Sequence, residues 1–357
     1  MAFDAFPAGE ASSPDPYRPT PIDIVVVREM LSRGCRLPPD IVDAVFDHAE
    51  YWAYSSNYID YQEEHGSALR INGSRPTENK FLVSLPHFVL YLYVFHLLMA
   101  RKQLRSFPVG FTGLGSEKSL TEELVYDMNE LTPRPLGKEH DTTFFRKLPK
   151  YPTPRLVHPV RKVVFTIKSH DQGWSSSSSP KGGYEGSHTW FEAGLERFDA
   201  EQQCDAHCTK DLRYNSSKSV ASALPLCALR PIQPPFEPMI TKGKYASKDE
   251  GGDIVDNPSY KYQHPLEPRQ DWEIQRNKLA TKTWQENEVT WSWDDNVDPE
   301  SEDAKALEEL GRGKGTGSGG LVRSLKLGDV VTIWGKARFP GWSNVVEKVK
   351  VDIYWAV

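Results

Sequence analysis

Alternating apolar and polar residues dominate the second half of this 357-residue chain and predict β-strands there. Residues 349–355 alternate strictly with a period of two, and residues 288–293 place three apolar side chains on one face and three polar ones on the other. Similar runs predict strands at 160–169, 189–195, 212–214, 272–274, 279–284, 330–334 and 345–356. The pattern therefore predicts a mainly β fold, in which residues 155–357 form an antiparallel jelly-roll sandwich behind a small helical region.

Two stretches interrupt the strand pattern and are expected to be disordered insertions. Residues 231–268 are rich in Pro and Gly and have little apolar periodicity. Residues 295–320 pass from an acidic stretch into a glycine-rich segment, 311–320, that superficially resembles a phosphate-binding loop. Lys314 is followed there by Gly315 instead of Ser or Thr, and a strand instead of a helix is predicted next, so a flexible linker is favoured.

The N-terminal part is predicted to be helical after a disordered segment, residues 1–20, that is rich in Pro, Ser and Ala. Residues 21–82 form the predicted helical region. One helix is expected to begin at Asp23, its N-cap, and to stop at Gly34. A second is expected from Pro38 onward, with an apolar stripe between Ile41 and Ala49. Residues 104–154 are expected to be an irregular connection.

An almost uncharged apolar run occupies residues 81–99. Its length permits a transmembrane helix, which would make this a single-pass membrane protein, although Pro86, His87 and His96 interrupt it. We favour the hypothesis that residues 83–103 translate a retained intron, because Val-Ser can be encoded by a common splice-donor sequence and Gln by an acceptor. A strongly apolar buried helix is the third alternative.

Composition argues against several classes of protein. The net charge of -6 and pI of about 6.0 give no electrostatic signal for a nucleic-acid partner. The four cysteines are too few for a disulfide framework, and Cys204 and Cys208 lack a second pair of metal ligands, so no metal or cofactor is predicted. The first residues lack the basic and apolar segments of a secretory signal, so a cytoplasmic or nuclear location is expected.

Two predicted turns display Trp beside polar groups, which is how sandwich folds build a binding edge. The candidate ligand-binding residues are Asp171, Gln172 and Trp174 in the first turn and Arg338, Trp342 and Asn344 in the second. Carboxylate, amide and guanidinium groups can pair with hydroxyls, and an indole can stack on a sugar ring. The pattern indicates a non-enzymatic module that binds a glycan or a partner protein.

A hydrolase is the alternative in the enzyme class, since His170, Asp171, His188 and Glu192 gather potential acids and bases. Asp171 and Glu192 would be the carboxylates of a glycosidase. No G-x-S-x-G motif is present to supply a serine nucleophile.

The segments RKVVFTIKSHDQGWS, GSHTWFEAGLERFD and LVRSLKLGDVVTIWGKARFPGWSNVVEKVKVDIYWAV resemble an uncharacterised group of filamentous-fungal proteins. The resemblance covers about residues 20–82 and 104–357. It implies a galactose-binding-like sandwich, the architecture also found in some glycan-recognising F-box proteins, and implies no catalytic residue.

Residues 37–46 resemble the opening of an F-box. That resemblance implies a ubiquitin-ligase substrate adaptor that docks a Skp1-type partner through Ile41 and Phe46. The simpler alternative is a helical hairpin that packs its own apolar stripe.

Overall fold

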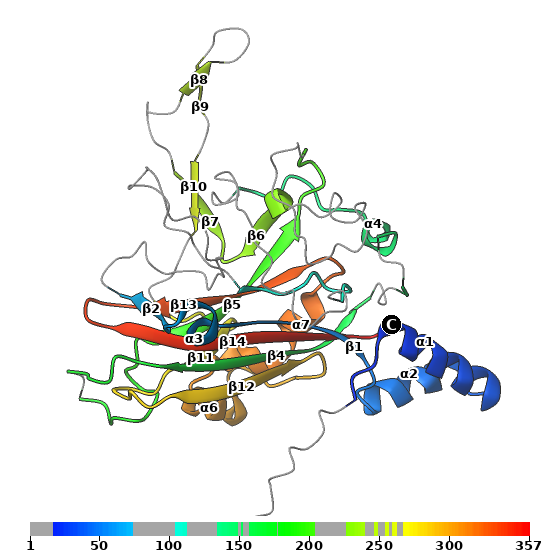
Figure 1. Ribbon diagram of the computed structural model, residues 1–357, viewed down its shortest axis with the longest axis horizontal. Coiled ribbons are helices and arrows are strands. Elements are labelled where there is room, and N and C mark those ends of the chain that lie inside the picture. The colour runs from blue at the N-terminus through cyan, green and yellow to red at the C-terminus, as the bar shows by residue number, and fades with distance from the viewer. Residues whose placement is uncertain are drawn as a thin grey trace, which may run out of the picture.

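Two antiparallel sheets form the body of the protein (Figure 1). A computed structural model describes residues 17–73, 104–112, 134–148, 151–152, 157–176, 178–203, 226–239, 246–248, 254–256, 259–262 and 267–357. Apolar side chains from both sheets share one core cluster. The predicted mainly β, sandwich-like architecture is therefore confirmed at this level.

The first sheet has β14 at its centre. Its strand order is β1 (Ala53–Asp60), β14 (Ser343–Trp355), β4 (Val160–His170) and β12 (Gln285–Ser292). Strand β2 (Leu69–Asn72) pairs with the start of β14, beyond β1, and the short helix α3 (Tyr61–His65) separates the two. Together β1 and β2 therefore line one side of β14, while β4 lines the other.

The second sheet is built around β5 and β13. Its strand order is β11 (Glu273–Arg276), β5 (Thr189–Phe198), β13 (Val330–Ala337) and β3 (Leu104–Arg105). Strand β6 (Leu229–Gln233) pairs with the end of β5. Two small ribbons pair β7 (Phe236–Met239) with β10 (Ser259–Tyr262) and β8 (Ala246–Lys248) with β9 (Ile254–Asp256).

The core lies between the sheets, and strand periodicity builds it. Alternate residues of β4 (Val163, Phe165, Ile167) and of β5 (Phe191, Ala193, Leu195) are buried in the same cluster. Burial of this apolar surface stabilises the fold by about 25 cal/mol per Å² removed from water. A second cluster, around Phe107, Phe145 and Phe198, packs the segment after β3 against β5 and α4 (Thr142–Arg146). The 3₁₀ turn η5 (Leu226–Ala228) also contributes to it.

The predicted N-terminal helices are present as α1 (Pro21–Glu29) and α2 (Pro39–His48), joined by the π-helical turn η1 (Met30–Gly34). The N-cap of α1 is Thr20, not Asp23. Thr20 Oγ1 accepts a hydrogen bond from the N–H of Asp23, and the Asp23 carboxylate accepts one from the N–H of Thr20. This reciprocal capping box explains the shift in the helix start.

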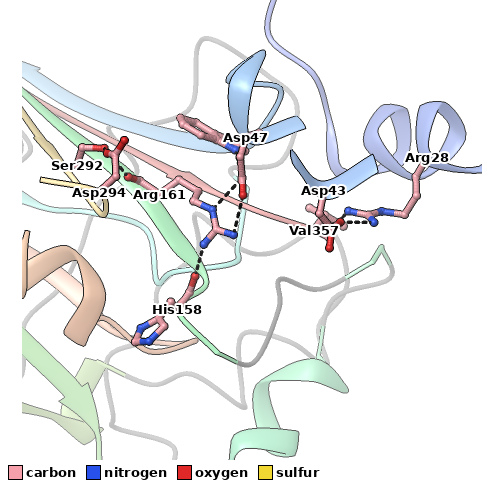
Figure 2. Close-up of polar contacts among 9 residues, drawn as sticks. Arg28, Asp43, Asp47, His158, Arg161, Ser292, Asp294 and Val357 are labelled. Carbon is pink, nitrogen blue, oxygen red and sulfur yellow. Dashed lines mark hydrogen bonds and ion pairs between the residues drawn. The ribbon is translucent and has the colours of Figure 1, made fainter. Parts of the chain in front are cut away.

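Ion pairs fasten this helical hairpin to the sandwich (Figure 2). Asp47 of α2 accepts from Arg161 of β4 at 2.9 and 3.3 Å, and Arg161 also donates to the main-chain oxygen of His158. Arg28 of α1 donates to Asp43 of α2 at 2.6 Å and to the main-chain oxygen of Val357 at 2.9 Å. The hairpin is thus part of the sandwich fold, and the predicted boundary at residue 155 is wrong, because β1, β2 and β3 also belong to the sheets.

The acidic and glycine-rich segment at 295–320 is structured, which corrects the prediction of disorder. It contains α6 (Glu302–Glu309), the 3₁₀ turn η6 (Lys314–Ser318) and the start of α7 (Gly320–Ser324). Its glycines allow close packing: a Cβ at Gly315 would lie 1.9 Å from Asp271 Oδ1, and one at Gly313 would lie 2.2 Å from the Gln270 oxygen. Close approach of the backbone, not flexibility, explains glycine here.

Several predictions fall outside the described residues. These are the apolar run at 83–103, most of the disordered segment 1–20, the strand at 212–214, and Cys204 with Cys208. Within the described ranges, no helix has the length and apolar character needed to cross a membrane. The described parts of the segment 231–268 contain the end of β6 and the strands β7, β8, β9 and β10, which corrects the prediction of a disordered insertion there.

Candidate functional site at the loop end of the sandwich

The strand connections at one end of the sandwich converge, and we call this region the loop end. It comprises residues 171–174 after β4, 180–188 before β5, 277–284 between β11 and β12, and 338–342 between β13 and β14. The helices α1 and α2 lie at the opposite end of the molecule (Figure 1). Antiparallel pairing of β4 with β14 explains the convergence, since one strand ends where the other begins.

The structure brings the two Trp-bearing turns together. Gln172 Oε1 accepts a hydrogen bond from the N–H of Ser343 at 3.0 Å, and Gln172 Nε2 donates to the main-chain oxygen of Trp174 at 2.7 Å. The Trp174 ring lies against Gly341, where an added Cβ would be 3.1 Å from the ring. Gly341 has a φ of +90°, which favours glycine. Gln172 is therefore a bridge between the turns.

Asp171 is a structural residue, which corrects its assignment as a ligand contact. Its side chain is fully buried and accepts hydrogen bonds from the main-chain N–H groups of Gly173, Thr281 and Ala280 at 2.7, 2.8 and 2.6 Å. Burial raises the pKa of Asp171, and these three N–H groups act in the opposite direction. Asp171 fixes the turn after β4 to the turn before β12.

Asn344 is also buried, which corrects its assignment as a ligand-binding residue. Its amide donates to the main-chain oxygens of Trp190 and Lys336 at 3.2 and 3.3 Å, and its oxygen accepts from Asn277 at 2.9 Å. Asn277 in turn donates to Thr189 Oγ1 and accepts from Ser169 Oγ. This buried network ties β4, β5 and β14 together directly beneath the loop end. Each of its polar groups has a partner, and a buried polar group without one would destabilise the fold.

Aromatic side chains remain exposed above this network. Trp174 is 55% exposed, Phe339 43% and Trp284 38%. The half-buried His188 packs edge-on against both Phe339 and Trp342, with ring centroids 4.8 Å apart in each case. His170 packs against Trp284 at 4.4 Å. The result is a surface of aromatic rings held by fixed neighbours.

Charge at the loop end comes from residues between these rings. Arg338 donates to Glu267 at 3.2 Å and its guanidinium lies 4.3 Å from the Phe339 ring centroid. Burial lowers the pKa of His188, and the nearby Arg338 and Arg276 lower it further. His188 is therefore a neutral imidazole at neutral pH.

Sequence reasoning missed Trp284 and Phe339 as members of this surface. The run 279–284 looked like a strand, but it is a turn in which Ala280 has a φ of +55° and its N–H bonds to Asp171. The signal that could have located Trp284 was the Lys-Thr pair before it, which interrupts the apolar pattern.

The second carboxylate of the hydrolase alternative, Glu192, lies in a buried ion cluster on β5. It accepts from Lys336 Nζ at 2.6 Å, from Arg269 Nε at 3.0 Å and from Trp190 Nε1 at 2.9 Å. Burial alone would raise the pKa of Glu192, but Lys336 and Arg269 outweigh it and leave the pKa lowered. Glu192 and Asp171 are thus both occupied by internal partners.

The two proposed docking residues of α2 differ in their surroundings. Phe46 is only 5% exposed and belongs to the core, so its assignment as a docking residue is corrected. Ile41 is 49% exposed. The outer face of α1 and the first residue of η1 add the exposed Ile22, Val26 and Met30, spaced four residues apart.

No group of three His, Cys, Asp or Glu side chains in the described part of the chain is arranged to hold a metal ion. Comparison with known proteins gives no relative: no protein-family model, curated protein or solved structure matches the chain. Its function must therefore be argued from the geometry of the loop end.

Proposed function

We propose that this protein is a non-enzymatic binding module that recognises a glycan at the loop end. The observation that carries the proposal is Trp174, a 55% exposed indole held against Gly341 by the Gln172 bridge. Indole faces stack on the apolar faces of sugar rings, and the polar groups around them select hydroxyl positions. We also propose that the sandwich is a jelly roll of the galactose-binding-like type.

The rigidity of the loop end supports binding. Asp171 and Asn344 fix the main chain beneath Trp174 through hydrogen bonds to buried groups. A binding surface whose side chains are already ordered loses less conformational entropy when the ligand arrives. This matters for glycans, because each sugar offers few apolar atoms for contact.

The distribution of the exposed rings over separate turns favours a glycan over a partner protein. A stable protein interface buries about 800 Å² on each partner around an apolar core. At the loop end, the exposed rings of Trp174, Trp284 and Phe339 belong to three different turns, and the exposed Lys282 and Thr283 precede Trp284 in its turn. Separate rings with polar neighbours suit successive sugar units of a glycan, whereas a protein interface would need a continuous apolar core.

Affinity electrophoresis in gels that contain single polysaccharides tests the proposal. We expect at least one polysaccharide to retard the wild-type protein and Trp174→Ala to migrate as if no polysaccharide were present. The matched control is Tyr58→Ala, because Tyr58 is a 42% exposed aromatic residue on β1, outside the loop end. Retardation that survives Trp174→Ala, or that is lost in Tyr58→Ala, would contradict the proposal.

We propose protein docking through the helical hairpin as a second candidate function. The observation that favours it is the row of exposed apolar residues on α1 and at the start of η1, together with Ile41 and Val45 on α2. A Skp1-type partner fits the F-box-like segment, and the adaptor function would require a cytoplasmic or nuclear location.

A pull-down with a Skp1-type protein tests this second candidate. Ile41→Asp should abolish recovery, whereas Phe46 variants would report only on folding because Phe46 is in the core. Recovery that is unchanged in Ile41→Asp would exclude docking at this surface. The hydrolase alternative has no comparable support among the described residues, because Asp171 and Glu192 are both committed to internal hydrogen bonds.

A further inference from the structure

Cations outnumber anions among the turns of the loop end. Lys181, Lys278, Lys282 and Arg338 lie in these turns, against Glu185 and Glu267 beside them. Asp171, the other acidic residue in these turns, is buried. The whole chain has a net charge of -6, so this surplus of positive charge is a local feature and not a reflection of composition.

Lys282 lies against Gly173, the residue that precedes the exposed Trp174. Its side chain crosses Gly173, where an added Cβ would be 2.1 Å from Lys282 Cγ. Gly173 precedes Trp174 and has a φ of +85°, so glycine both permits the turn and makes room for the lysine stem. Lys282 is exposed, and no carboxylate of the described residues pairs with its ammonium group.

Arg338 brings a second cation from the turn that contacts Trp174. Its carboxylate partner, Glu267, is 79% exposed, and ion pairs of this kind contribute little to stability. The guanidinium is stacked on Phe339 and the main-chain N–H of Arg338 bonds to the oxygen of His188 at 2.9 Å. A ligand carboxylate could therefore replace Glu267 without disturbing the turn.

Lys278 extends the cationic surface toward the turn before β5. Its ammonium lies 5.8 Å from the ring centroid of Tyr184, and the main-chain N–H of Gly182 joins the neighbouring turns by donating to the oxygen of Leu279 at 2.9 Å. Two carboxylates further along the strands, Glu286 and Glu347, lie on either side of Lys168, and Glu347 is paired with it. The charge of Glu347 is thus already balanced by Lys168.

We infer that the ligand is an acidic glycan, one that carries carboxylate or sulfate groups on its sugar rings. This inference rests on the proposed function and specifies its ligand. A sugar ring stacks on Trp174 while its acidic group pairs with Lys282 or Arg338, since Lys282 packs against Gly173, the residue before Trp174, and Arg338 belongs to the turn that contacts the indole. Charge-assisted hydrogen bonds of this kind are stronger than those to neutral hydroxyls.

A single-stranded nucleic acid would also use aromatic rings and cations. The observations favour the glycan, because a nucleic-acid site needs a positively charged groove that follows many phosphates and this chain is acidic overall. Binding of a single-stranded nucleic acid at the loop end would overturn the inference.

Affinity electrophoresis with paired polysaccharides tests the inference. The acidic probes are polygalacturonate and heparin, and the neutral probes are galactomannan and laminarin, at low salt and at about 0.3 M NaCl, where the Debye length is below 8 Å. We expect retardation by an acidic probe that is at least about tenfold weaker at the higher salt concentration. Lys282→Gln should weaken it several-fold, and Lys305→Gln, an exposed lysine on α6, should leave it unchanged.

The possible results separate this inference from the proposed function. Retardation by neutral probes alone, lost in Trp174→Ala but not in Lys282→Gln, would overturn the acidic ligand and leave glycan binding intact. Retardation by none of the four probes would overturn the acidic ligand, and a wider neutral panel that also fails would overturn glycan binding. Displacement of a bound acidic probe by a single-stranded oligonucleotide at equal charge concentration would overturn both.

Discussion

Single residues at the loop end divide into those that hold the main chain and those that face solvent. Asp171, Gln172 and Asn344 hold it, and Trp174, Phe339 and Trp284 face outward. The sequence predicted that these residue types lie together, because both Trp turns follow or precede a strand. It could not predict which polar side chain is buried, since a carboxylate or amide beside a glycine serves a turn as well as a ligand.

Asn344 gives a direct test of the structural assignment. Asn344→Leu should destabilise the protein by about 1–3 kcal/mol, because the main-chain oxygens of Trp190 and Lys336 and the amide of Asn277 would lose partners. Urea denaturation followed by Trp fluorescence measures this. Thr290→Ala, at an exposed site on β12, is the control and should leave the midpoint unchanged. An unchanged midpoint in Asn344→Leu would argue that Asn344 is free for ligand.

Glu273 makes stability depend on pH. Burial raises its pKa from 4.5 to about 7, although Arg276 opposes the shift. The folded state therefore binds more protons than the unfolded state between about pH 4.5 and pH 7, and stability falls as pH rises through that window. Thermal unfolding between pH 5 and pH 8 should show a decline that is smaller in Glu273→Gln. Equal slopes in the two proteins would show that another group is responsible.

At the scale of elements, the sequence predicted the strands in which apolar and polar residues alternate. It missed strands that bury polar side chains. The strand predicted at 160–169 is β4 (Val160–His170), and the run at 345–356 is β14. In β1 the buried positions include Ser55 and Asn57, and Asn57 donates to the main-chain oxygen of Arg105. Apolar periodicity cannot reveal such a strand. The prediction of disorder in the glycine-rich segment was wrong because glycine is favoured both by close packing of the backbone and by flexibility.

Strand β14 should be essential for folding. It lies between β4 on one side and β1 with β2 on the other, so its removal leaves β1 and β2 without a partner, exposes one edge of β4 and opens the core. Truncation after Gly341 should give insoluble protein or loss of the cooperative unfolding transition. Expression followed by circular dichroism during heating provides the measurement. A soluble truncate that unfolds cooperatively would contradict the central position of β14.

At the scale of the whole molecule, a packed sandwich separates two surfaces. The helical hairpin lies at one end, fastened through Asp47 and Arg28, and the aromatic loop end lies at the other (Figure 1). A glycan at one end and a partner protein at the other would not compete for space. The protein could then connect recognition of a sugar to a second component.

Isothermal titration calorimetry gives the sharpest test of glycan recognition at the loop end. The titrant is the polysaccharide that most retards the wild-type protein in affinity electrophoresis, and the proteins are wild type, Trp174→Ala, Trp174→Phe and Tyr58→Ala. We predict that Trp174→Ala weakens binding at least about tenfold, or 1.4 kcal/mol, that Trp174→Phe recovers part of the loss, and that Tyr58→Ala binds as the wild type does. All four proteins should unfold at the same urea concentration within error. Wild-type affinity in a folded Trp174→Ala would contradict glycan recognition at the loop end.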